Sequence, residues 1–527
     1  MLGRLALVLH AHLPYVRHPE HERSLEERWL HEALWESYLP LLDVLDRLEK
    51  DGVAATLTLS VSPPLAAMLR DRLLKARFVA HLDRLARLAE KLEKVVAAEL
   101  LPALRFYQGR LAEVAAVWDR VGGDVLGAFK KHAAKERLEL WTTSATHAYL
   151  PGLAAAPASI RAQIRLGLRA FASVFGEEPK GFWLPECAYE PGFGDDLAEA
   201  GVACTIVDGH GLLLASPRPP RGVLEPIVAS NGVAFFGRDA GASHDVWSRK
   251  GGFPGHPSYR EFYRDVGFDL AEEELDGDVG PGGTRVMTGL KLHRITGPGL
   301  EKEPYDPGAA IAQAKEHARL FVEARGATLR EGGGGLVVAP FDAELFGHWW
   351  LEGPAFLEEV LRLVDARRDP SVRATTPAAF LAEGPELSVA EPAASSWGEG
   401  GFGAAWTGPE AARLWRHVHH AEELVRAAVE DHQGTRGLSG RALDQAIREL
   451  LLLQSSDWAF MLRRGEMGEY AAHRAKSHAT RVARLVAVAR TAAPTLDDLA
   501  WVHAVKDQDR FLAELEGARL RDAFDPW

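Results

Sequence analysis

Cysteine is scarce in this sequence, whose 527 residues include only Cys187 and Cys204. Two cysteines cannot form the disulfide framework of a small secreted domain, so we expect a cytoplasmic protein. The first apolar run, Leu5 to Leu9, is shorter than the hydrophobic region of a secretory signal peptide. No run approaches the roughly 20 apolar residues that span a bilayer, so we expect no membrane anchor.

An excess of positive charge is also lacking. The chain has 61 Lys plus Arg against 74 Asp plus Glu, a balance of −13, whereas nucleic-acid binding requires a basic surface. We therefore expect no nucleic acid among its partners. The glycine run at 332–335 lacks the Gly-Lys-Ser/Thr of a phosphate-binding loop, and no His-Glu-x-x-His motif of a zinc protease occurs.

The residues that are present are typical of a globular α/β protein. They are 47% hydrophobic and include 14 Trp. Over the first two thirds of the chain, apolar runs of strand length alternate with amphipathic stretches of helix length, which predicts parallel β/α units. The expected strands cover residues 5–9, 55–59, 138–141, 181–184, 203–207 and 336–339.

Helical periodicity divides the rest of the chain. One helix is predicted from a capping box at Ser24 and Glu27 to Asp51, and a long helical region fills most of 65–135. A stretch rich in Pro, Gly, Ala and Ser at 384–408 predicts a linker. Beyond it the pattern is helical only, over about 408–434, 440–463, 467–492 and 496–517.

These patterns predict two domains. The first, 1–395, is expected to be the catalytic unit, with insertions at about 65–135 and 188–232. The second, 396–527, is expected to be all-α. A polar run that ends in Asp457 and Trp458 follows a leucine-rich helix, which indicates that this domain lends one of them to the active-site cleft.

Polar side chains follow several of the predicted strands directly. In a β/α barrel the carboxyl ends of the parallel strands share one mouth, and that mouth carries the chemistry. We therefore expect these residues to converge on one site. They are His10, His12, Ser144, His147, Glu186, Asp208, His210 and Asp342.

Two of these positions carry carboxylates in apolar and aromatic segments. Glu186 follows one strand, and Asp342 and Glu344 follow another. Two carboxylates from different strands, close to aromatic rings, are the equipment of a glycosidase. A salt-bridged Glu at a sheet end is the simpler reading of Glu186. For at least one of Trp349 and Trp350, core packing is the preferred interpretation.

The spacing of His10 and His12 places both side chains on one side of a strand. Such a pair, with Asp208 or Asp342, could ligate zinc in a metal-dependent carbohydrate deacetylase or hydrolase. Hydrogen bonds to sugar hydroxyls are equally available to it. The spacing leaves both readings open.

Five motifs, in order along the chain, resemble glycoside hydrolase family 57, and within it the 1,4-α-glucan branching enzymes. They are His-Ala-His-Leu-Pro-Tyr at 10–15, Ala-Thr-His-Ala-Tyr at 145–149, Trp-Leu-Pro-Glu-Cys-Ala-Tyr at 183–189, Phe-Asp-Ala-Glu-Leu-Phe-Gly-His-Trp-Trp at 341–350 and Ser-Ser-Asp-Trp at 455–458.

This resemblance implies a distorted (β/α)7 barrel followed by a helical domain, and a retaining mechanism without metal or other cofactor. It implies an α-glucan as partner, such as amylose, amylopectin or glycogen. An α-amylase or 4-α-glucanotransferase of the same family, and a non-catalytic glucan-binding protein, are the alternatives. The sequence carries no signal for oligomeric state.

The resemblance also implies roles for single residues. Glu186 matches the nucleophile and Asp342 the general acid/base. Together with the strand-end pattern, it predicts the side chains that bind the glucan. These are His10, His12, His147, Trp183, Arg238, Trp247, Trp397, Trp406 and Asp457.

One loop departs from the branching enzymes. In those enzymes a loop between the nucleophile strand and the region matching Trp247 carries a tyrosine that covers the site. Here no Tyr occurs between Tyr189 and Tyr259, and the segment 211–232 is short and rich in Pro and Arg. We therefore expect a truncated or replaced lid, and substantial hydrolysis beside branching.

Overall fold

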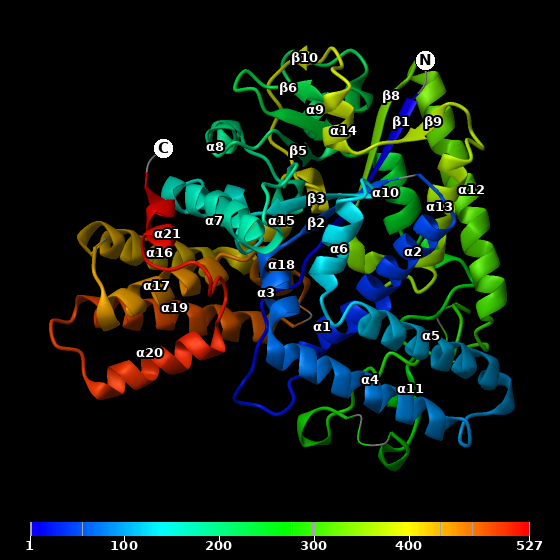
Figure 1. The fold of residues 1–527 in the computed structure, drawn as a ribbon, viewed down its shortest axis with the longest axis horizontal. Helices are drawn as coiled ribbons and strands as arrows, with labels where there is room; N and C mark the ends of the chain where they lie inside the picture. The colour runs from blue at the N-terminus through cyan, green and yellow to red at the C-terminus, as the bar shows by residue number, and fades with distance from the viewer. Residues whose placement is uncertain are drawn as a thin grey trace.

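The central feature of the computed structural model is a curled parallel sheet surrounded by helices (Figure 1). The structure describes residues 3–525 except 55, 276, 278, 298, 300, 433 and 466. Seven parallel strands follow one another in the order β8-β1-β2-β3-β4-β5-β7. They are β1 (Gly3–Ala11), β2 (Leu57–Val61), β3 (Leu138–Thr143), β4 (Phe182–Trp183), β5 (Cys204–Val207), β7 (Ala234–Gly237) and β8 (Gly335–Asp342).

The two ends of this sheet meet at a single point. Arg238, just beyond β7, forms a parallel bridge with Val338 of β8, and the next backbone N–H, that of Asp239, donates to Val338 O at 2.9 Å. This contact closes the sheet into a distorted seven-stranded barrel, as predicted. All six expected strands are observed near their predicted positions, although Ala55, the predicted start of the second one, lies outside the described residues.

Three short strands extend the sheet. β6 (Ile227–Val228) pairs antiparallel with β7, β10 (Ser388–Val389) pairs with β6, and β9 (Val372–Ala374) pairs with β1. Sequence analysis missed these three and also β7, whose apolar run of four residues is short. The range 188–232, expected as an insertion, contains barrel strand β5 together with β6.

Strand alternation separates two cores. Leu5, Leu7 and Leu9 of β1 pack outward among the helices, whereas Ala6 and Val8 pack in the barrel interior. His10 and His12 continue the inward series, which places them above this interior at the mouth. The register sets His10 beside Asp342 of β8 and beside Ser60 of β2.

Helices cover the barrel on its outside (Figure 1). The region 65–135 is helical as expected and forms four helices rather than one. The helices up to the end of the barrel are α1 (Glu27–Ala33), α2 (Leu39–Lys50), α3 (Pro63–Arg70), α4 (Arg72–Leu92), α5 (Leu101–Arg120), α6 (Val125–Ala133), α7 (Pro157–Phe175), α8 (Phe193–Glu199), α9 (Gly209–Leu213), α10 (Ala240–Trp247), α11 (Val266–Asp269), α12 (Pro307–Glu331), α13 (Gly353–Asp365), α14 (Pro377–Ala382) and α15 (Ala404–Thr407).

The capping box predicted at Ser24 is wrong. Ser24 Oγ donates to the carboxylate of Glu26 instead, and α1 has no side-chain cap. Glu27 is occupied elsewhere, because its carboxylate accepts from the backbone N–H of His18 at 2.8 Å and from Arg77 at 2.6 Å. These tertiary contacts outweigh the local capping pattern. A π-helical turn, Leu34–Tyr38, joins α1 to α2.

The C-terminal helices form a layer to one side of the barrel (orange to red in Figure 1). They are α16 (Ala412–His432), α17 (Gly437–Leu453), α18 (Ser456–Arg464), α19 (Gly468–Arg490), α20 (Leu496–Gln508) and α21 (Ala518–Arg521). The single helix predicted at 440–463 is broken between α17 and α18, because Ser456 N–H donates to His147 O at 3.0 Å. None of the helices within the described ranges is both long and apolar enough to cross a membrane.

Candidate active site

One cavity of about 480 Å³ opens at the carboxyl ends of the strands, and we call it the strand-end cavity. Glu186 and Asp342 both line it, from β4 and β8. Of the nine predicted glucan-binding side chains, eight also line it, and they come from the barrel and from the C-terminal region. These are His10, His12, His147, Arg238, Trp247, Trp397, Trp406 and Asp457.

Trp183 is the exception among the predicted binding residues. Its side chain is fully buried and does not line the strand-end cavity. It lies beneath His10, with the two rings 4.6 Å apart and nearly parallel, and its edge contacts Trp397. Trp183 therefore supports two cavity residues from below rather than contacting a substrate, because its position inside β4 directs the ring into the barrel.

Glu186 lies in a tight turn directly after β4, with a left-handed backbone (φ 64°). Its carboxylate accepts two hydrogen bonds, from Trp397 Nε1 at 2.7 Å and from Ser456 Oγ at 2.9 Å. Burial raises the pKa of Glu186 to about 7 against the lowering effect of the Trp397 bond, and the charge of Asp342 raises it further. The two donors favour the ionised form of Glu186.

Asp342 ends β8 in a different environment. Among the described residues none donates a hydrogen bond to its carboxyl group. Burial raises the pKa of Asp342 to about 7, the nearby Glu344 raises it as well, and His12 and Arg238 act in the opposite direction. Between two coupled carboxyls, the one with two donors ionises first and the one without donors keeps the proton. The geometry thus favours an ionised Glu186 beside a protonated Asp342.

Three histidine rings that line the strand-end cavity continue a stack that begins at the buried Trp183, in the order Trp183, His10, His147 and His12. Neighbouring centroids lie 4.6, 4.7 and 4.1 Å apart. Burial lowers the pKa values of His10 and His147 well below the usual value, and the neighbouring histidines lower them further. Both imidazoles are therefore neutral. Their Nε2 atoms have no hydrogen-bond partner within the described part of the chain, whereas the Nδ1 atoms bond to Ser60 and Ser456.

His12 joins the barrel to the C-terminal helices. Its Nδ1 bonds to Ser62 Oγ at 2.9 Å, and its Nε2 bonds to Asp457 Oδ2 at 3.1 Å. Although burial disfavours a charge on Asp457, His12 holds the pKa of this carboxyl below its usual value. The prediction that the helical region lends Asp457 to the cleft therefore agrees with its position, while Trp458 is buried.

Ser456 is a site residue that sequence analysis did not assign. Its hydroxyl group accepts a hydrogen bond from His147 Nδ1 and donates one to the carboxylate of Glu186. The hydroxyl therefore fixes the imidazole and the carboxylate relative to each other. Its motif was visible as Ser-Ser-Asp-Trp, but only the break between α17 and α18 shows which serine faces the cavity.

Arg238 follows β7 and also lines the strand-end cavity. It donates to Asp208 Oδ2 at 2.9 Å, and its guanidinium carbon lies 5.3 Å from the ring centroid of Trp397. Asp208 also bonds to His210 Nδ1 at 2.8 Å, and His210 Nε2 donates to Gly401 O at 2.7 Å. The strand-end residues after β5 therefore anchor the loop that carries Trp397 instead of lining the cavity.

Trp247 and Trp406 also line the strand-end cavity, the first exposed and the second buried. Trp247, at the end of α10, is 50% exposed and lies against Trp397. Trp406 is stacked between Tyr149 and Phe460, at 5.1 and 6.2 Å. Flat rings at the edge of a polar cavity offer stacking surfaces for the apolar faces of sugars.

The two adjacent tryptophans after β8 differ in position. Trp350 is buried, as the core-packing interpretation predicted for one of the pair, whereas Trp349 is 53% exposed and lines the strand-end cavity. No side chain from 211–232 lines it, since this segment forms the end of α9 and the turn into β6. The truncated or replaced lid therefore stays a prediction.

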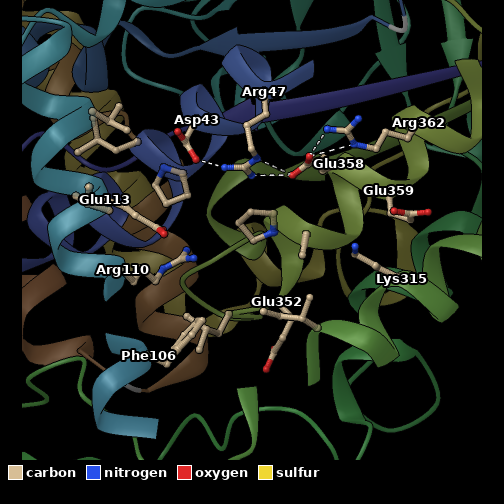
Figure 2. A pocket seen from close by; sticks show the side chains of 18 of the residues that line it. Asp43, Arg47, Phe106, Arg110, Glu113, Lys315, Glu352, Glu358, Glu359 and Arg362 are labelled. Carbon is tan, nitrogen blue, oxygen red and sulfur yellow. Dashed lines mark hydrogen bonds and ion pairs between the residues drawn. The ribbon is translucent and has the colours of Figure 1, made fainter. Parts of the chain in front are cut away.

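A second cavity, of about 500 Å³, lies among α2, α5, α12 and α13 (Figure 2). Its cations are largely matched by carboxylates: Arg47 pairs with Asp43 and Glu358, and Arg362 pairs with Glu358 at 2.7 Å. No strand-end residue lines it. We therefore place the candidate active site in the strand-end cavity.

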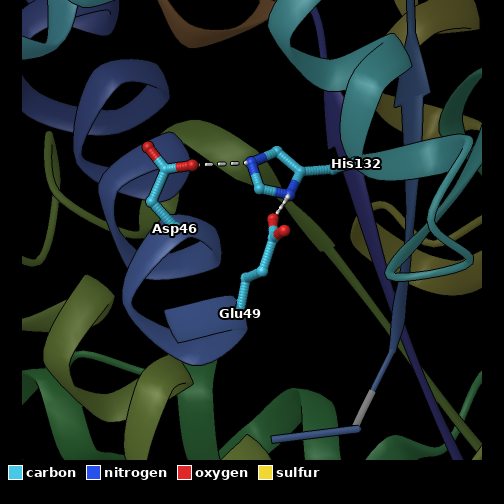
Figure 3. A group of neighbouring side chains, drawn as sticks. All are labelled: Asp46, Glu49 and His132. Atoms are coloured by element: carbon cyan, nitrogen blue, oxygen red, sulfur yellow. Dashed lines mark hydrogen bonds and ion pairs between the residues drawn. The ribbon is translucent and has the colours of Figure 1, made fainter. Parts of the chain in front are cut away.

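Metal ligation was the alternative reading of His10 and His12. Within the described ranges, two groups place three potential ligand atoms within 4.8 Å of one another, and neither includes a strand-end residue. They are Asp46, Glu49 and His132 (Figure 3), and Glu449, His478 and Asp509. In the first group the imidazole bridges the two carboxylates through different nitrogens, so the three do not converge on one point.

Two family models match separate parts of the chain. The model of glycosyl hydrolase family 57 matches residues 6–267, and that of the C-terminal region of 1,4-alpha-glucan branching enzymes matches residues 417–518. A 1,4-alpha-glucan branching enzyme of Thermococcus kodakarensis is 34% identical over 522 residues, which cover 92% of this chain and 73% of that protein. The chain belongs to glycosyl hydrolase family 57.

Two solved structures are similar to this protein over almost the whole chain. An alpha-amylase of Thermotoga maritima has a TM-score of 0.90 at 35% identity, covering 99% of both chains. A branching enzyme of Pyrococcus horikoshii has a TM-score of 0.88 at 32% identity, covering 99% of this chain and 97% of its own. The predicted family and fold class are confirmed.

Proposed function

We propose that this chain is a retaining 1,4-α-glucan branching enzyme in which Glu186 is the nucleophile and Asp342 the general acid/base. The observation that carries the proposal is the unequal bonding of the two carboxyls in one cavity. Glu186 has two hydrogen-bond donors, and Asp342 has none among the described residues. A retaining glycosidase needs one ionised and one protonated carboxyl, and this arrangement supplies both.

The first step breaks an α-1,4 bond. Glu186 attacks the anomeric carbon, while Asp342 gives its proton to the departing glycosidic oxygen. One chain leaves with a free 4-hydroxyl group, and the other remains bonded to Glu186 as a glycosyl ester.

The second step makes the branch. Asp342, now ionised, takes the proton of a 6-hydroxyl group on an acceptor glucan. That oxygen attacks the anomeric carbon, the ester bond breaks and Glu186 is restored as a carboxylate. Two displacements at one carbon give an α-1,6 bond with retained configuration.

Water competes with the acceptor in this second step. Because no residue of 211–232 covers the strand-end cavity, we propose that hydrolysis accompanies branching to a substantial extent. The same observation, with the similarity to an alpha-amylase, supports α-amylase activity as the second candidate. The two carboxyls serve both reactions equally.

The neighbouring side chains are proposed to hold the glucan. His10, His147 and Asp457 offer hydrogen bonds close to the two carboxyls. Trp247 and Trp397 offer stacking surfaces, and Trp406, which is buried between Tyr149 and Phe460, is proposed to contact the glucan from the cavity wall. Arg238 is proposed to bind sugar hydroxyls while it also orients Trp397. His12, whose ring nitrogens bond to Ser62 and Asp457, is proposed to contact the glucan through its ring and to orient Asp457.

The domain division 1–395 and 396–527 is kept as part of this proposal. It is supported by β10, the last strand, which ends at Val389, and by the purely helical structure that follows Ala404 within the described ranges. A cytoplasmic location is proposed because both cysteines are free and buried. The expected lack of nucleic-acid partners stays a prediction from net charge.

Incubation with amylose tests the proposal. New α-1,6 linkages and released reducing ends are counted separately over time, in the wild type and in Glu186→Gln. We expect both products from the wild type and neither from the variant. Reducing ends alone would favour the α-amylase candidate, and amylose binding without either product would favour a non-catalytic glucan-binding protein.

A further inference from the structure

Three aromatic side chains form a continuous surface beside the strand-end cavity, and we call it the aromatic platform. Its members are Phe262, Tyr263 and Trp349. Trp349 is 53% exposed and Tyr263 is 61% exposed. Large aromatic rings that stay exposed side by side commonly mark a binding surface.

The aromatic platform is held rigidly. Trp349 stacks on Phe262, with centroids 4.5 Å apart and planes 22° apart. The ammonium group of Lys291, which is buried, lies 3.9 Å from the centroid of Phe262, and Tyr263 meets Phe262 edge-on at 5.2 Å. The guanidinium carbon of Arg249 lies 4.8 Å from the centroid of Tyr263.

The backbone below the platform is fixed as well. Arg260 donates to His348 O at 2.7 Å, which ties the segment of Phe262 to the segment of Trp349. The buried carboxylate of Glu261 accepts from the backbone N–H of Tyr263 at 3.2 Å and pairs with Lys302 at 3.1 Å. Rings held in this way lose little conformational entropy when a ligand stacks on them.

The position of the aromatic platform indicates which of the two glucan chains, donor or acceptor, can contact it. Trp349 lines the strand-end cavity from the segment that follows Asp342, and its backbone N–H donates to Glu344 O at 3.3 Å. It therefore lies on the acid/base side, where both the leaving and the attacking oxygen contact Asp342. Trp397, which bonds to Glu186, is on the nucleophile side.

We propose that the aromatic platform binds the acceptor glucan, with its pyranose rings stacked on Trp349 and Tyr263. This rests on the proposed function and adds the surface that decides between transfer and hydrolysis. Neutral sugars suit these flat rings, and Arg249 beside Tyr263 offers donors to their hydroxyl groups. An acceptor bound here holds its 6-hydroxyl group close to Asp342, so this hydroxyl competes better than water for the glycosyl-enzyme.

A malto-oligosaccharide fluoride as donor isolates the acceptor step. Fluoride leaves without a sugar on the acid/base side, so glycosyl-enzyme formation does not require the platform. Fluoride release and chain transfer are measured at increasing concentrations of maltohexaose. The proteins compared are the wild type, Trp349→Ala, Tyr263→Ala and Tyr263→Phe, with Leu496→Ala as an exposed control 83% accessible at the start of α20.

We expect the acceptor concentration that gives half-maximal transfer to rise about tenfold in Trp349→Ala and Tyr263→Ala. This rise should exceed any change in fluoride release without acceptor. Tyr263→Phe keeps the ring, so its half-maximal acceptor concentration should rise less than that of Tyr263→Ala. The half-maximal concentration of Leu496→Ala should match that of the wild type.

An unchanged half-maximal acceptor concentration in both alanine variants would contradict acceptor binding by the aromatic platform. The assignment of Glu186 and Asp342 as the catalytic pair would not be affected. Because Tyr263 is a surface residue, its variant tests the proposal even if Trp349→Ala fails to fold. A wild type that releases no fluoride would instead contradict the proposed function itself.

Discussion

Trp397 donates its indole N–H to Glu186 Oε2 at 2.7 Å, and its backbone N–H donates to Glu186 O at 2.9 Å. The same residue therefore fixes both the peptide and the carboxylate of the proposed nucleophile. The bond from the indole opposes the effect of burial on the pKa of Glu186. A loop that follows β10, the last strand along the chain, thus controls the charge of a residue in the turn after β4.

Removing either donor to Glu186 should weaken the nucleophile. Trp397→Phe and Ser456→Ala each take away one hydrogen bond that lowers the pKa of this carboxyl, so its pKa rises and ionisation requires a higher pH. We expect kcat/KM to fall roughly tenfold or more and the acidic limb of its pH profile to move upward.

Trp406→Phe is the matched control for that experiment. Trp406 lines the same cavity but gives no hydrogen bond to Glu186. Its variant should raise KM and leave the acidic limb in place. If Trp397→Phe behaved in the same way as Trp406→Phe, the indole would only stack on substrate.

The alkaline limb should depend on Glu344. This buried carboxyl accepts from the Tyr38 hydroxyl and from the backbone N–H of His12 at 3.1 Å, and its charge raises the pKa of Asp342. Glu344→Gln removes the charge, so Asp342 loses its proton at lower pH. We expect the alkaline limb of kcat/KM to move down by about one pH unit.

Glu399→Gln serves as the control for Glu344→Gln. Glu399 also lines the strand-end cavity but is paired with Arg463 at 3.2 Å. Its replacement should leave the limb unmoved. If the alkaline limb of kcat/KM lies at the same pH in Glu344→Gln and in the wild type, Asp342 is not the group that titrates on that limb.

The buried acid should also cost folding stability. Burial raises the pKa of Asp342 to about 7 from an ordinary value of 3.8. The folded state therefore binds this proton more tightly, and stability falls as pH rises from about 4 to about 7. Asp342→Asn removes the cost, which is roughly 2–4 kcal/mol in unfolding free energy.

Calorimetry at two pH values measures this effect. The Tm of Asp342→Asn should exceed that of the wild type at pH 8 and match it at pH 3.5, below both pKa values. Glu177→Gln, at an exposed carboxylate, should change neither value. Equal Tm values for Asp342→Asn and wild type at pH 8 would contradict a strongly raised pKa.

Metal removal should not affect the reaction. Both ring nitrogens of His12 bond to protein oxygens, on Ser62 and Asp457, and His10 uses Nδ1 on Ser60. We expect full activity on amylose after prolonged dialysis against a chelator. Activity that disappears and returns with zinc would support the metal-dependent reading of these histidines.

The sequence predicted the barrel where a strand was an uninterrupted apolar run. Leu5 to Leu9 and Leu336 to Ala339 identify their strands by composition alone, and the polar residues after them identify the mouth. β7 was missed because four residues between turns give little periodicity. Its omission hid the strand that precedes Arg238, the residue whose bridge to Val338 closes the barrel.

Two site residues were misjudged for different physical reasons. Trp183 reads as a binding residue because aromatic rings near a carboxylate often bind sugars, but strand alternation turns it into the interior. Ser456 reads as an ordinary helix residue until its contacts with His147 and Glu186 are seen. Such contacts span about three hundred residues of chain, and no local pattern encodes them.

Trapping the covalent intermediate tests the central claim most directly. Asp342→Ala, incubated with α-maltosyl fluoride, can form the ester because fluoride needs no acid, but it lacks the base that resolves it. After proteolysis, mass spectrometry should find a maltosyl group on the peptide that contains Glu186, and on no other peptide. A label on a different residue, or complete turnover without any labelled protein, would contradict the assignment of Glu186 as nucleophile.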